Sequence, residues 1–131
     1  MTYQKITWPG IAALSLVAGC HSHQPPPTTA QDVEAAKQEA QHAVEQARIE
    51  ATKDVKSALK TGGGNPRDVA LAKATAAYDV AMIKAEGDHS VATEKCQTLQ
   101  VSMMQACKDQ ADAQYETAKA TAKATRTARQ Q

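Results

Sequence analysis

A hydrophobic pattern with an eleven-residue period runs through most of the chain. The segment DVALAK (68–73) returns as DVAMIK (79–84) and SVATEK (90–95), and related segments stand at 32–37 and 43–48. Between these anchors the small and apolar residues step by three, four and four positions. Eleven residues in three turns is about 3.67 residues per turn, close to the natural α-helix, so the pattern predicts nearly straight helices with one apolar stripe each.

Breaks in the pattern divide the chain into three predicted helices, at about 31–60, 66–97 and 103–129. In TGGGNP, glycines end the first helix, and Asn65 with Pro66 is typical of an N-cap and a first helical position. Before the third helix, Ser102 with Gln105 fits a capping box. The three stripes are Val33, Ala36, Ala40, Val44, Ala47, Ala51, Val55 and Ala58; Val69, Ala72, Ala76, Val80, Ile83, Gly87 and Val91; and Met104, Cys107, Ala111, Tyr115, Ala118 and Ala122.

These helices have similar lengths and short connections, which favours an all-α, antiparallel three-helix arrangement. The helix at 66–97 carries a second stripe on its opposite side, made of Leu71, Tyr78, Met82, Ala85, Ala92 and Cys96. We therefore expect it to be the middle helix. A Lys or Arg stands four residues after most of the large stripe residues, where its methylene groups cover apolar surface.

The composition limits how stable this fold is. Ala dominates, Phe is absent and Trp8 is the single Trp, so the stripes bury little area and the monomer is expected to be marginally stable. Self-association and contact with a membrane surface are therefore open alternatives. The net charge of +1 gives no long-range field, so no nucleic-acid partner is expected.

The N-terminal residues have the pattern of a targeting signal. Lys5 precedes a short apolar run from Ile11 to Ala18, too short to span a bilayer as a helix. The end of this run, LVAGC, resembles the lipobox of bacterial lipoproteins. This resemblance implies a signal peptide at residues 1–19 and a lipidated Cys20. Three successive prolines favour an extended, Pro-rich linker at 20–30, and the eleven-residue pattern predicts a helical domain at 31–131.

The lipobox resemblance also implies a location. Cys20 would carry a diacylglyceryl thioether and an acylated amine, with palmitate among the acyl chains, and several chains suffice for stable anchoring. His21 is not the Asp that retains such lipoproteins at the inner membrane, so we expect the periplasmic face of the outer membrane. The alternative is an ordinary secretory signal that ends near a Cys.

Cys96 and Cys107 are the remaining cysteines. On one continuous helix they would be about 16 Å apart, whereas a turn near residues 98–102 brings them face to face. In an oxidising periplasm we favour a disulfide between them; the alternative is two reduced or intermolecularly paired thiols on an unbroken helix.

Residues 90–120 also resemble small Ala- and Lys-rich proteobacterial periplasmic proteins with a VAxEKC segment and a second Cys. That resemblance supports the location and the disulfide, and it implies no biochemical activity.

Other candidate chemistry is sparse. His21 and His23 are interpreted as polar linker residues, and TGGGNP lacks the Lys-Ser/Thr of a phosphate-binding loop. No metal, cofactor or catalytic set is predicted, and we expect no enzyme activity. Four residues form a basic C-terminal stripe: Lys119, Lys123, Arg126 and Arg129. This stripe either complements the helix end or contacts anionic lipid head groups or another envelope polymer.

Two functions are consistent with this pattern. The first is a lipid-anchored periplasmic protein with a structural or interaction role in the cell envelope, partnered by the membrane, by its own copies or by an envelope protein. The second is a membrane-surface or stress-protective protein, because Ala-rich eleven-residue repeats resemble those of late embryogenesis abundant proteins and apolipoproteins. The second hypothesis predicts disorder in dilute buffer.

Overall fold

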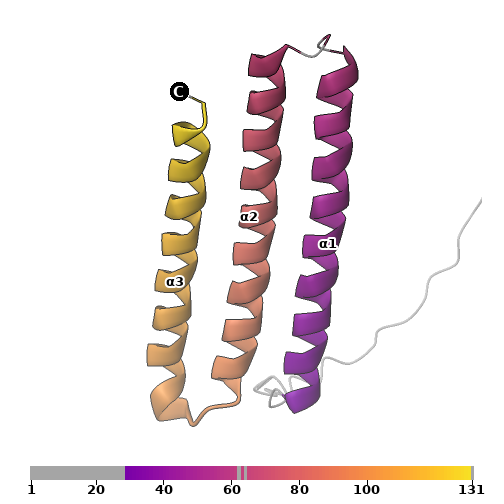
Figure 1. The fold of residues 1–131 in the computed structure, drawn as a ribbon. Coiled ribbons are helices and arrows are strands. Elements are labelled where there is room, and N and C mark those ends of the chain that lie inside the picture. The colour runs from indigo at the N-terminus through magenta and orange to yellow at the C-terminus, as the bar shows by residue number, and fades with distance from the viewer. Residues whose placement is uncertain (1–28, 62, 64, 131) are drawn as a thin grey trace, which may run out of the picture.

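Three long α-helices make up the described part of the chain. The computed structural model describes residues 29–61, 63 and 65–130, and its helices are α1 (Ala30–Thr61), α2 (Pro66–Gln97) and α3 (Val101–Ala128) (Figure 1). The all-α prediction is confirmed. The predicted signal peptide, Cys20, His21, His23 and nearly all of the 20–30 linker lie outside the described residues.

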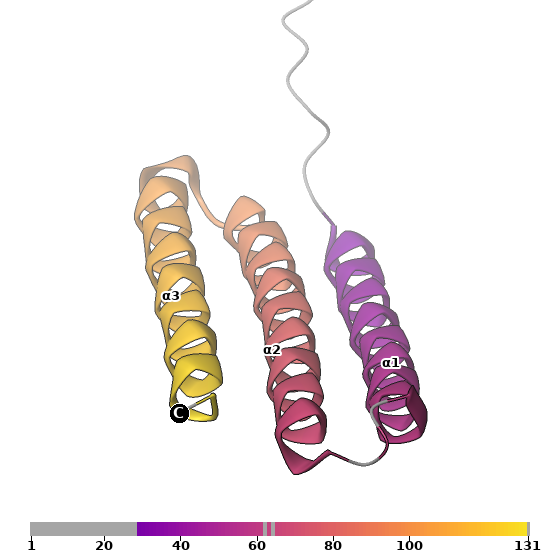
Figure 2. The ribbon, with the colours of Figure 1, turned by 90° about the horizontal axis from the view of Figure 1, so that it is seen from above.

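The helices form a single antiparallel layer with α2 in the middle. Helix α2 packs against both α1 and α3, and among the described residues α1 and α3 are not in contact with each other. Viewed nearly along their axes, the helices stand side by side in a row (Figure 2). The two stripes of α2 explain this arrangement, because each outer helix has one apolar stripe and α2 has one for each neighbour.

The α1–α2 interface is built from small side chains. Ala47 of α1 is buried, as are Val69 and Ala76 of α2. The two helices approach closely at Gly87, where a Cβ atom would lie 2.7 Å from the Cβ of Ala40. Such a distance leaves no room for a side chain, so Gly87 permits the close packing that the Ala-rich stripes provide elsewhere.

The α1–α2 connection follows the predicted chemistry. Gly63 has a positive φ of 59°, a left-handed conformation that favours glycine. Asn65 is the N-cap of α2, and its side-chain oxygen accepts a hydrogen bond from the Arg67 N–H at 3.1 Å. Pro66 occupies the first helical position, where its missing N–H has no cost.

The start of α3 corrects one prediction. The helix begins at Val101, with Gln100 as an N-cap that makes no side-chain hydrogen bond, so the predicted capping box of Ser102 and Gln105 is wrong. Gln105 instead donates to Asp109 at 2.8 Å. The reason is the shortness of the turn: Thr98 closes α2 by donating from its N–H and its hydroxyl to the Lys95 carbonyl, and the chain reverses at once.

The start of α1 carries a capping box that was not predicted. The Thr29 N–H and hydroxyl donate to the Asp32 carboxylate at 2.6 and 2.7 Å, and the Asp32 N–H donates back to the Thr29 hydroxyl at 3.3 Å. These two donors, the backbone N–H first, lower the pKa of Asp32 below its ordinary value.

Candidate functional site

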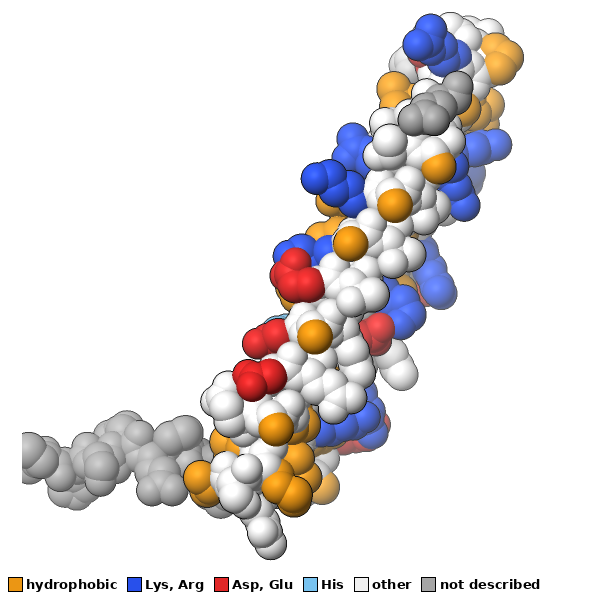
Figure 3. Space-filling view, turned by 90° about the vertical axis from the view of Figure 1, so that its left-hand side faces the viewer, with side chains coloured by type: hydrophobic (Ala, Val, Ile, Leu, Met, Phe, Trp, Pro, Cys, Tyr) orange, Lys and Arg blue, Asp and Glu red, His pale blue; other side chains and the backbone are white. Residues whose placement is uncertain are grey.

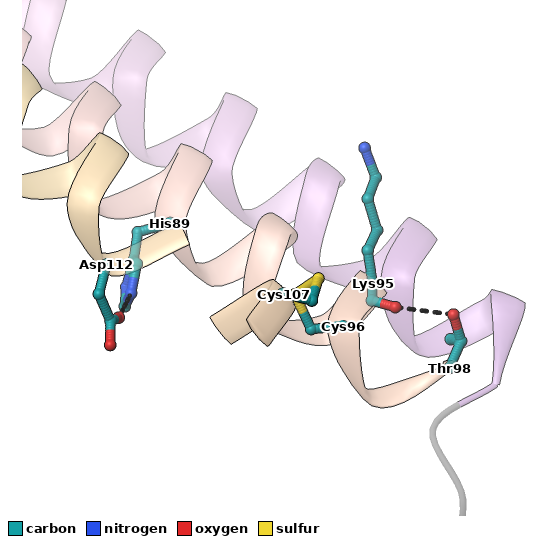
Figure 4. Close-up of a disulfide and its surroundings, with 6 residues drawn as sticks. All are labelled: His89, Lys95, Cys96, Thr98, Cys107 and Asp112. Carbon is teal, nitrogen blue, oxygen red and sulfur yellow. Dashed lines mark hydrogen bonds and ion pairs between the residues drawn. A yellow bond between two sulfur atoms is a disulfide. The ribbon is translucent and has the colours of Figure 1, made fainter. Parts of the chain in front are cut away.

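The turn between α2 and α3 brings the two cysteines together. Cys96 and Cys107 form a disulfide whose Cα atoms are 5.5 Å apart (Figure 4). Cys96 is 1% exposed, which makes it the most deeply buried side chain among the described residues. The turn that the sequence analysis required for this bridge is therefore present, and the alternative of an unbroken helix is wrong.

A polar cluster joins α2 to α3 above the disulfide. His89 Nε2 lies 2.6 Å from Asp112 Oδ1, and the His89 ring stacks on Tyr115 with ring centroids 4.8 Å apart (Figure 4 shows His89 and Asp112). The Lys119 ammonium lies 4.7 Å from the centroid of the Tyr115 ring and donates to Glu116 at 2.7 Å. The hydrogen bond to Glu116 raises the pKa of Lys119 above its ordinary value.

This cluster includes part of the predicted basic C-terminal stripe. Besides Lys119, the Arg126 guanidinium lies over the ring of Tyr78, 5.0 Å from its centroid. Arg126 therefore contacts α2, whereas the described contacts of Lys119, with Tyr115 and Glu116, lie within α3. The stripe is also not free of acids, because Glu116 pairs with Lys119.

A His–Asp pair is also found in catalytic sites, where it orients the imidazole toward a nucleophile. Here Tyr115 stacks on the imidazole, and the described contacts of His89 join α2 to α3. Among the described residues, no group of three His, Cys, Asp or Glu side chains is arranged to hold a metal ion. The geometry of His89 is that of a clamp between two helices.

The three most voluminous of the grooves found among the described residues open on one face of the layer. Two follow the α1–α2 seam, with volumes of about 900 Å³ and 620 Å³, and one of about 420 Å³ follows the α2–α3 seam. Lys84 and Asp88 line a groove on each seam, and Ala77 lines both the 620 Å³ and the 420 Å³ grooves. Shared walls place all three grooves on the same side of α2, and we call this side the grooved face.

The grooved face is basic along α1 and α2. Its cations there are Lys37, Arg48, Lys56, Lys73, Lys84 and Lys95. The acids that line the same grooves are paired: Glu45 with Arg48 at 3.8 Å and Asp88 with Lys84 at 2.5 Å. Lys56, Lys73 and Lys95 have no carboxylate partner among the described residues. The 620 Å³ groove has a floor of Ala and Val and no acidic lining residue.

The eleven-residue repeat explains this separation of charge. Each residue turns a helix by about 100°, so the acid before a stripe residue and the base four after it project to opposite sides of the stripe. Five of the bases follow a stripe Val by four: Lys37, Arg48, Lys73, Lys84 and Lys95. Seven acids directly precede a stripe residue: Asp32, Glu39, Glu50, Asp54, Asp68, Asp79 and Glu86. The side of the layer opposite to the grooves is therefore acidic along α1 and α2.

Comparison with known proteins identifies no relative. No protein-family model, no curated protein and no solved structure matches this chain. The site must therefore be interpreted from its own geometry. None of the described helices combines the length and apolar composition that crossing a bilayer requires.

The disulfide pair was predicted from the sequence, but two features of the site were not. The grooved face was not predicted, although the positions of Asp and Lys around each stripe residue contain the necessary signal. The contact between His89 and Asp112 was also missed, because their separation of 23 residues depends on the register of the α2–α3 hairpin.

Proposed function

We propose that this protein is a lipid-anchored, non-catalytic component of the bacterial envelope whose helical layer binds an envelope protein through the grooved face. The LVAGC sequence and the Pro-rich linker support the anchor. The open architecture supports the binding role, because α1 and α3 leave one side of α2 accessible in grooves.

The single observation that carries the binding role is the combination of apolar grooves with unpaired cations. Lys56 and Lys73 flank a groove whose floor includes Val55 and Val80. An amphipathic segment with acidic residues beside an apolar stripe matches this surface in both charge and polarity. Rim charges of this kind direct association and select the partner more than they add affinity.

Lipid labelling tests the anchor. We expect radiolabelled palmitate to appear on the wild-type protein and to be lost in Cys20→Ala, because the thioether and the new N-terminus both depend on that residue. Cys107→Ala serves as the matched control and should retain the label. Incorporation that persists in Cys20→Ala would reject the anchor.

Site-specific photo-crosslinking in intact envelopes tests the binding role. A photoreactive residue at Ala77, an exposed position between two grooves, should crosslink to an envelope protein, whereas one at exposed Asp79 on the acidic side should not. Charge reversal by Lys73→Glu should reduce the Ala77 crosslink. Equal crosslinking from Ala77 and Asp79 would contradict a role for the grooved face.

The stress-protective hypothesis remains a second candidate because the core is thin. Of the eight buried apolar residues in the described part of the chain, six are Ala. Circular dichroism of the mature chain with Cys20→Ser separates the two hypotheses: the envelope-binding proposal predicts helix in dilute buffer, and the alternative predicts disorder that becomes helical only with lipid or on drying.

A further inference from the structure

Three exposed hydrophobic side chains gather at one end of the layer. Leu99, Val101 and Met103 are 38%, 83% and 51% exposed, and all three belong to the turn between α2 and α3 or to the first residues of α3. Figure 3 shows hydrophobic side chains clustered at this lower end of the molecule. We call these three residues the apolar tip.

The apolar tip also lacks charge. The segment from Cys96 to Cys107, CQTLQVSMMQAC, contains no Asp, Glu, Lys, Arg or His. The opposite end of the layer differs, although Leu59 and Leu71 are exposed there. Lys60 directly follows Leu59, and Asp68 lies three positions before Leu71. A neutral turn with exposed apolar side chains favours an environment of low polarity over a polar partner.

The disulfide fixes the tip in place. It closes the chain across the charge-free segment, with a sequence separation of 11 between the two cysteines. Thr98 caps α2 through its hydroxyl, which donates to the Lys95 carbonyl at 2.7 Å (Figure 4). The exposed side chains are thus presented by a braced turn, which reduces the conformational entropy lost when the tip binds.

The tip lies at the end of the layer where α1 begins. Figure 1 shows the start of α1 and the α2–α3 turn at the same lower end. Cys20 precedes Ala30 by ten residues, which span at most about 35 Å when fully extended. A bilayer that holds acyl chains on Cys20 is therefore within reach of the tip and far from the opposite end.

We propose that the apolar tip inserts into the interface of the phospholipid bilayer beside the lipid anchor. This inference rests on the proposed lipidation of Cys20. The layer then stands on the membrane, with helices of 32 residues extending about 48 Å from it. The grooved face then stands at an angle to the membrane and stays accessible to a protein partner. Because the tip is uncharged, its insertion does not depend on anionic lipid or on ionic strength.

Fluorescence quenching by brominated lipid tests the orientation. The one Trp of the sequence, Trp8, lies in the predicted signal peptide, so a Trp introduced into the mature lipoprotein is a single reporter. Val101→Trp reports on the tip, and Leu59→Trp is a matched control at the far end, about 45 Å away along α1. Both variants are reconstituted with their native lipid into vesicles of brominated phosphatidylethanolamine and phosphatidylglycerol.

We expect a roughly twofold loss of Val101→Trp fluorescence, because interfacial apolar groups bury about 5–10 Å into the headgroup and acyl boundary. Leu59→Trp should keep its fluorescence. Adding Met103→Glu to the Val101→Trp protein should reverse most of the quenching, whereas 0.5 M salt, roughly a 4 Å screening length, should not. Circular dichroism checks that each variant is helical.

Each outcome has a defined meaning. If both reporters are quenched, the layer lies flat on the membrane; if neither is quenched while palmitate is on Cys20, the layer is tethered without contact. Either result overturns the tip proposal and leaves the anchor intact. Absence of palmitate from Cys20 overturns the proposed function, and the tip proposal with it.

Discussion

The two seams of the layer join helices in different ways. Between α1 and α2 the contact depends on shape, with small side chains in register and Gly87 against Ala40. Between α2 and α3 the contact adds specific links, namely the disulfide and the pairing of His89 with Asp112. The layer thus combines one seam that depends on close approach with a second seam that is also held by discrete links.

The difference follows from the side chains available to each seam. Ala stripes bury little area, so they stabilise a helix pair only when the helices are close enough for many contacts. Helix α3 has 28 residues, four fewer than α1, and its stripe ends in small residues such as Ala118 and Ala122. The aromatic and covalent contacts of α3 compensate for this shorter and sparser stripe.

Removal of the disulfide is expected to have the largest effect on this comparison. Cys96→Ser/Cys107→Ser should lower the free energy of unfolding by about 2–4 kcal/mol, because the unfolded chain is no longer constrained. Amide hydrogen exchange should rise mainly in α3 and the end of α2, and remain slow in the middle of α1. Urea unfolding followed by circular dichroism measures the total loss.

Reductant provides the control for this experiment. Dithiothreitol should reproduce the effect in the wild-type protein and have no effect on the double variant. Free thiols in the unreduced wild type, or a disulfide-linked dimer on a non-reducing gel, would contradict a bridge within one chain.

A side chain at Gly87 is expected to disturb the other seam. Gly87→Val places atoms where a Cβ alone would be 2.7 Å from the Ala40 Cβ and 3.3 Å from its Cα, so the helices must separate. Overpacking of this kind costs about 1–3 kcal/mol. Hydrogen exchange should then rise in α1 and leave the disulfide-linked end of α3 protected, the reverse of the cysteine variant.

Two further variants separate the clash from helix propensity. Ser90→Val introduces the same side chain at an exposed position of α2 and should change stability by less than about 0.5 kcal/mol. In the double variant Ala40→Gly/Gly87→Ala, removal of the Ala40 Cβ makes room for a Cβ at position 87. We expect its free energy of unfolding to be closer to that of the wild type than to that of Gly87→Val. A Gly87→Val protein as stable as the wild type would show that the seam does not require close approach.

Much of the fold follows from the sequence because the stripes are long and regular. Helix α2 begins at Pro66 and ends at Gln97, as predicted, since Asn65 and the glycines mark its start and the less helix-like TLQV segment follows its end. The start of α3 was placed two residues late, because the Ser102 signal for a capping box also occurs inside helices. Local sequence signals predict the start of α3 poorly, because the Cys96–Cys107 disulfide also constrains the turn before it.

The candidate site was less predictable, for two physical reasons. The side of a helix that faces solvent depends on which neighbours it packs against, so the grooved face emerges only once α1 and α3 are both placed beside α2. Leu71 illustrates the same limit: it was assigned to the second stripe of α2, yet it is half-exposed in the second turn of that helix. Pairing across α2 and α3 likewise depends on the register that the disulfide sets.

Loss of the His89 ring is expected to have the smallest effect. His89→Ala removes the hydrogen bond to Asp112 and the stack on Tyr115. Each contact contributes about 0.5–1.5 kcal/mol, and since His89 is partly exposed we expect a total near 1 kcal/mol. The matched control is His42→Ala in α1, an exposed position, which should be nearly neutral. Equal unfolding midpoints in urea for the two variants would show that the disulfide, and not the His89 clamp, holds the register of the α2–α3 seam.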